Sequence, residues 1–134
     1  MVMGLRLFCL LAVVAISCPA LSHHSFAAEF DAKRPVTFKG KVTKVQWMNP
    51  HVHFYIDVSD QQKGIVNWDL ESQSVNVLTR RGMTKATFLQ VGDQITVDAY
   101  LAKDGTNLAA ANTVKFADGI TRAVGVSLAS PANR

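Results

Sequence analysis

The chain has 134 residues, of which 49% are hydrophobic, and a formal net charge of +4 at pH 7. This length suits one domain with one core. The basic residues are scattered along the chain, so we expect no nucleic-acid partner. Cys9 and Cys18 are the two cysteines, and both lie near the N-terminus.

Residues 1–22 have the pattern of a secretory signal peptide. Arg6 provides the positive charge, residues 7–16 form an apolar run too short to span a bilayer, and residues 20–22 form a small-x-small cleavage site. Cleavage there would leave a periplasmic or secreted chain with no cysteine, no transmembrane segment and a net charge of about +3. Disulfide and thiol chemistry would then be excluded.

Two other cleavage sites stay open. A cut after Ala20 would place His23 third from the new amine, which is also an arrangement that chelates copper. A lipoprotein cut would instead lipidate Cys18, and we treat this lipid-anchored form as the minor alternative. The oligomeric state stays open as well.

Residues 23–35 form an N-terminal arm without a clear period, in which Phe26 and Phe30 are expected to dock on the domain. Residues 36–47 alternate as a β-strand, but the apolar set slips by one residue between Val42 and Val45. Such a slip predicts a β-bulge near residues 43–44.

Five further segments have the pattern of strands, and one has the pattern of a short helix. Ser74 is the expected N-cap of the helix, which starts at Val75 and ends before Gly82. The strands are expected at residues 51–59, 65–71, 94–102, 110–116 and, as a short edge strand, 120–126. Residues 127–134 are expected to form a flexible tail.

This order predicts a mainly β protein with a single domain over residues 23–126. The OB-fold has a long bent first strand and a helix between strands three and four. It is a small antiparallel Greek-key barrel, here with five to six strands expected. A generic antiparallel barrel of the same size is the alternative.

The four histidines form two close pairs. After cleavage behind Ser22, His23 would offer its free amine and its imidazole, followed by His24. His51 and His53 lie two residues apart, so they share one face of their strand. These nitrogens, with Glu71 as an additional ligand, suit copper first and zinc second. The competing interpretation is that His51 and His53 are ordinary exposed histidines of a solvated strand and that His23 and His24 belong to a disordered chain start.

A metal-free binding module is the second hypothesis, with an envelope glycan, peptide or protein as its ligand. OB-type barrels bind ligands on the face of strands two and three. The alternation favours core positions for the two tryptophans. The candidate ligand-binding residues are Trp47, Asn49, Tyr55, Asn67, Trp68 and Asp69. An enzyme that uses an exposed copper site for oxidation chemistry is the third hypothesis. The sequence has no nucleophile–base pair, phosphate loop or cofactor fingerprint, so we favour a binding protein over an enzyme.

Several short motifs resemble a bacterial family of small secreted proteins of unknown function. They are His23-His24-Ser25-Phe26, Ala28-Glu29-Phe30-Asp31, Pro35-Val36-Thr37, Gly40-Lys41-Val42, Val45-x-Trp47-x-Asn49-Pro50-His51, Trp68-x-x-Glu71, Leu78-x-Arg80-x-Gly82, Gly92-Asp93 and Ala102-Lys103-Asp104-Gly105. The family often has a tryptophan where this chain has Met83. The resemblance implies a periplasmic single-domain β protein without an assigned activity. It places emphasis on His23, His24, Trp47, Asn49, His51, Trp68 and Glu71, and less on His53.

Overall fold

The computed structural model describes residues 25–125. The predicted signal peptide, His23, His24 and the predicted tail at 127–134 lie outside this range. Neither helix of the described part has the length or the apolar character needed to cross a membrane. In chain order the elements are α1 (Phe26–Glu29), β1 (Phe30–Gln46), β2 (His53–Asp60), β3 (Gly64–Glu71), α2 (Val75–Arg80), β4 (Gln94–Ala102), β5 (Leu108–Lys115) and β6 (Thr121–Ala123).

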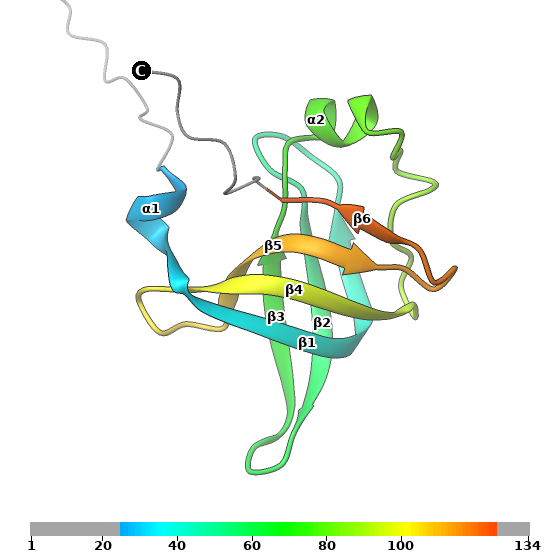
Figure 1. Cartoon of the computed structure of the whole chain (residues 1–134). Coiled ribbons are helices and arrows are strands. Elements are labelled where there is room, and N and C mark those ends of the chain that lie inside the picture. Colours follow the sequence, from blue (N-terminus) through cyan, green and yellow to red (C-terminus); the bar gives the residue numbers. More distant parts are fainter. Residues whose placement is uncertain (1–24, 126–134) are drawn as a thin grey trace, which may run out of the picture.

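The six strands form one sheet that curls into a barrel (Figure 1). The strand order is β3-β2-β1-β4-β5-β6, with antiparallel neighbours, and a parallel pairing of β3 with β5 closes the ring. Together with α2 between β3 and β4, this confirms the predicted OB-fold-like barrel. The Ser74 side chain accepts a hydrogen bond from the backbone N–H of Val77, so the predicted helix cap is also confirmed.

β1 is long enough to pair with two neighbouring strands along different parts of its length. Its first part pairs with β4 and its second part with β2. The register with β2 shifts between Val42 and Lys44, which confirms the predicted bulge. A Cβ on Gly40 would lie 2.5 Å from the carbonyl oxygen of Asp57, so β1 and β2 approach too closely there for any side chain.

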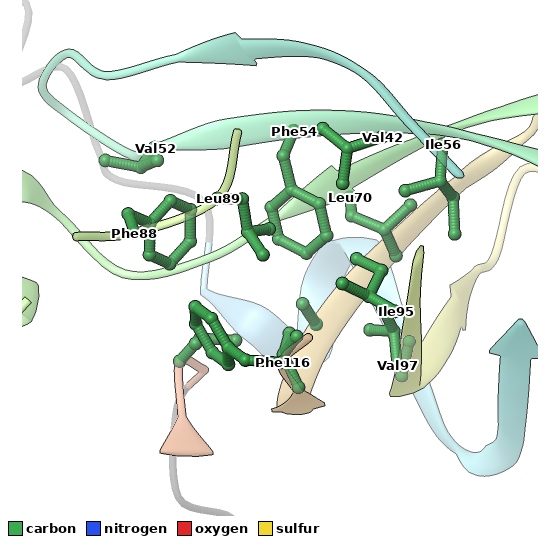
Figure 2. Packing of buried hydrophobic residues seen from close by; sticks show 14 of the residues in the cluster. Val42, Val52, Phe54, Ile56, Leu70, Phe88, Leu89, Ile95, Val97 and Phe116 are labelled. Carbon is green, nitrogen blue, oxygen red and sulfur yellow. The ribbon is translucent and has the colours of Figure 1, made fainter. Parts of the chain in front are cut away.

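The main core fills the barrel with residues from every large strand (Figure 2). Phe54 of β2 and Leu70 of β3 are fully buried, and they face Ile95 and Val97 of β4. The segment between α2 and β4 adds buried side chains to this core, among them Phe88, whose ring packs on those of Phe54 and Phe116. The predicted alternation on β2 and β3 therefore points its apolar side into this core.

A smaller apolar cluster holds α1 against the side of the barrel. Phe30 is 3% exposed and packs with Ala102 and Ala110, while Phe26 and Tyr100 cover them. The Phe26 ring lies 5.5 Å from that of Phe30 and 5.7 Å from that of Tyr100. This confirms that Phe26 and Phe30 dock on the domain. It also extends β1 back to Phe30, ahead of the predicted start at residue 36.

Candidate functional site

The outer face of β2 and β3 carries the polar residues that alternate with the core. In the antiparallel register His53 lies opposite Glu71, and Tyr55 lies opposite Asp69. His51 precedes β2 on the same side of the chain, because the intervening Val52 is fully buried. The structure therefore brings the predicted ligands His51, His53 and Glu71 together, with Asp69 beside them.

Each histidine pairs diagonally with a carboxylate of β3. The Nδ1 atom of His53 lies 2.7 Å from Oδ1 of Asp69, and Nδ1 of His51 contacts Oε1 of Glu71. An ionised carboxylate only accepts hydrogen bonds, so Nδ1 must carry the proton in both rings. Within residues 25–125 neither Nε2 atom forms a hydrogen bond or an ion pair. In the neutral ring each Nε2 therefore has a free lone pair.

The carboxylates change the proton affinities of this cluster. The hydrogen bond that His53 donates to Asp69 raises the pKa of His53 above its ordinary value, although burial opposes the change. The charges of Glu71 and Glu29 act in the same direction as Asp69. Burial raises the pKa of Glu71, while the charges of His51 and His53 lower it. Glu29 of α1 thus acts on the cluster, although the sequence included it only in the Ala28-Glu29-Phe30-Asp31 motif and not among the candidate site residues.

Farther along the outer face of β2 and β3, around Tyr55 and Asn67, the polar side chains form hydrogen bonds with one another. The Tyr55 hydroxyl donates to Oε1 of Gln46 at 3.0 Å, and Lys44 lies over the Tyr55 ring. Asn67 donates to Asp57 at 2.7 Å and to Thr43 at 3.1 Å. Burial also raises the pKa of Tyr55. The polar groups near Tyr55 and Asn67 therefore hold the strands together.

A cavity of about 180 Å³ opens beside the histidine–carboxylate cluster. It lies between α1, the first part of β1 and the end where β3 meets β5. His51 and Glu71 contribute to its wall, and residues of α1 and β4 complete it. The residues that line it are Phe26, Glu29, Phe30, His51, Glu71, Ser72, Tyr100, Ala110, Ala111, Asn112 and Gly125.

The remaining predicted site residues lie elsewhere. Trp47 packs on Phe88 with ring centroids 5.3 Å apart, and Trp68 packs on Phe38 at 4.4 Å. Both tryptophans thus lie against the main core, as the alternation favoured. Asn49 precedes a cis peptide bond to Pro50, and its side chain accepts a hydrogen bond from the backbone N–H of Val75 at 3.1 Å. Asn49 therefore ties the loop before His51 to the start of α2.

Residues 25–125 hold no group of three or more His, Cys, Asp or Glu side chains placed to bind a metal ion. The described part of the candidate site offers two imidazole Nε2 atoms. The other two predicted nitrogen donors, His23 and His24, lie outside the described residues.

The fold and the paired histidines define a small OB-like barrel with a polar site beside a cavity. A family of unknown function (DUF6152) matches residues 11–111, and the chain belongs to this family. No curated protein and no solved structure matches the chain.

Proposed function

We propose that this chain is a periplasmic metal-binding protein that takes copper in preference to zinc. Its ligands are Nε2 of His51 and of His53, together with the amine and imidazole of His23. His24 and Glu71 are additional ligands. Cleavage after Ser22 by the export machinery creates the required N-terminus.

The observation that supports this proposal is the bond from each Nδ1 to a carboxylate. Histidines that bind metals almost always donate their other ring N–H to a carboxylate, a carbonyl or water. This bond fixes the tautomer and makes Nε2 a stronger donor. Asp69 plays this part for His53, and Glu71 plays it for His51. Two imidazoles and an N-terminal chelate form the nitrogen-rich set that Cu(II) prefers.

Chain connectivity supports the N-terminal ligands. Ser25 directly precedes α1, and Phe26 of α1 lines the same cavity as His51. Consecutive Cα atoms are 3.8 Å apart, so the Cα of His23 lies within about 8 Å of that of Ser25. The docking of Phe26 and Phe30 fixes the start of the described chain beside the cavity that His51 lines, two residues from the amine that cleavage would create.

Native mass spectrometry of protein exported by a bacterial host tests the proposal. We expect the measured mass to be that of a chain that starts at His23 and that keeps one bound Cu(II) ion in the presence of a weak chelator. His51→Ala and His53→Ala should each weaken copper binding by about tenfold or more. As a matched control, three alanines inserted before His23 place both histidines beyond the third position from the amine and leave residues 25–125 unchanged.

Four results would contradict all or part of the proposal. A mass that corresponds to a lipidated chain starting at Cys18 would refute the proposal outright. A chain that starts at His23 but binds no copper would also refute it. Copper binding that is unchanged by both strand variants would remove His51 and His53 from the site. Copper binding that is unchanged by the three inserted alanines would remove the N-terminal chelate.

A metal-free binding module is the second candidate function, and the cavity beside β3 favours it. Its ligand would be an envelope glycan, peptide or protein. Binding that persists after treatment with a strong chelator would support this candidate, and binding that disappears with the metal would count against it.

A further inference from the structure

The cavity beside α1 has the size of a small organic molecule. Its volume is about 180 Å³. An apolar protein cavity of about 150 Å³ accommodates benzene, so this one has room for a single ring with a short substituent. A bare metal ion would leave most of that space unused.

One part of the cavity wall is aromatic and apolar. Phe26, Phe30 and Tyr100 line it together with Ala110 and Ala111. The rings of Phe26 and Tyr100 meet edge to face at 88°, and Phe30 is fixed because it is almost fully buried. Aromatic side chains set at an angle to one another pack well around another flat apolar ring.

The polar part of the wall is acidic. Glu29 and Glu71 line the cavity, and no lysine or arginine of residues 25–125 does so. Glu71 is the more buried of the two, with 16% of its side chain exposed, and it contacts His51. Within the described range Glu29 forms no ion pair, and the nearby Lys103 ammonium donates to the carbonyl of Ala27. Among the described lining residues His51 is the basic one, and it contacts Glu71. A cation that enters the cavity would therefore share Glu71 with His51 and would meet Glu29, which has no ion-pair partner in the described range.

We infer that this cavity binds a small organic ammonium ion that carries one apolar group of about the size of a benzene ring. The apolar group would lie against Phe26, Phe30 and Tyr100, and the ammonium group would face Glu29 and Glu71. A neutral molecule would desolvate the carboxylates without a counter-charge, which is unfavourable. An anion would be repelled by both carboxylates.

This inference does not depend on metal binding, so it is tested on the mature protein after removal of metals with a chelator. Benzylammonium is the probe, and benzyl alcohol and benzoate serve as the neutral and anionic probes of similar shape. We expect benzylammonium to bind about tenfold more tightly than benzyl alcohol, and benzoate not to bind. NMR titration should show the largest shift changes at Tyr100, Ala110 and Ala111.

Two variants and a matched control locate the contacts. Glu29→Gln should weaken benzylammonium binding about fivefold and leave benzyl alcohol binding unchanged, since Glu29 is exposed and acts through its charge. Phe26→Ala should weaken the binding of both probes. Asp60→Asn removes the same charge at the turn between β2 and β3 and should change neither affinity.

Each outcome decides the inference. Equal affinities for benzylammonium and benzyl alcohol would overturn the requirement for a cation. Shift changes centred away from Tyr100, or no binding of either probe, would overturn the site itself. None of these three results would bear on copper binding, which is measured separately by mass.

Discussion

Phe30 links the barrel to the segment that borders the candidate site, so its truncation is the most informative test of the structure. The side chain is 3% exposed and packs on Ala102 and Ala110, with Phe26 and Tyr100 over it. A buried aromatic side chain removes about 150–250 Å² from water. At about 25 cal/mol per Å² this corresponds to about 4–6 kcal/mol, of which alanine retains a minor part.

We therefore expect Phe30→Ala to lower the free energy of unfolding by about 3–4 kcal/mol. Urea unfolding followed by tryptophan fluorescence measures this change, because Trp47 and Trp68 both pack on the main core. Val91→Ala is the matched control. Val91 is 69% exposed, so its truncation should change stability by less than about 0.5 kcal/mol.

Hydrogen exchange separates a local effect from a global one. The backbone N–H of Lys103 donates to the carbonyl of Glu29, so its protection reports on the docking of α1. We expect Phe30→Ala to reduce this protection more than that of amides inside the barrel. A loss of stability below about 1 kcal/mol with unchanged protection at Lys103 would refute the packing of Phe30 described above.

Three further predictions concern the cluster, the cavity and the backbone around it. In the metal-free protein Asp69→Asn should lower the pKa of His53 measured by NMR, and an unchanged value would refute their hydrogen bond. Because the folded-state pKa of His53 is raised, its charged form stabilises the fold at acidic pH, and this contribution should disappear as pH rises through the raised pKa. Cu(II) and benzylammonium should weaken each other's binding, because both are drawn to the same carboxylates, and independent affinities would separate the two sites. Gly125→Ala should destabilise the protein by about 2 kcal/mol or more in urea unfolding, because the added Cβ would overlap the carbonyl oxygen of Ala111. An unchanged urea midpoint would contradict this close approach.

Local sequence patterns were sufficient to predict most of the strands of the barrel. The alternation from Gln94 to Ala102 predicted β4 with the bounds that the structure has. The one-residue slip after Val42 predicted the bulge in β1. These signals are local because side chains of a strand alternate with a fixed period of two, so the buried face can be identified without knowledge of the partner strand.

The start of β1 and the helix α1 were not predicted. Residues 31–34 are Asp-Ala-Lys-Arg, which show no alternation, and Phe26–Glu29 is too short to show a helical period. Phe30 is held in place by contacts with β4 and β5, which lie far away in the sequence. Such tertiary contacts override weak local preferences.

The sequence by itself determined the OB-like order of elements, the outward face of β2 and β3, and the presence of His51, His53, Asp69 and Glu71 on that face. The tertiary structure alone decided which carboxylate meets which imidazole. The diagonal pairs depend on the register that sets His53 opposite Glu71. The tertiary structure also decided that Glu29 and Tyr100 border the same cavity as His51. A period of two identifies the face of a strand, but the residue opposite is fixed only when the strands pair and the barrel closes.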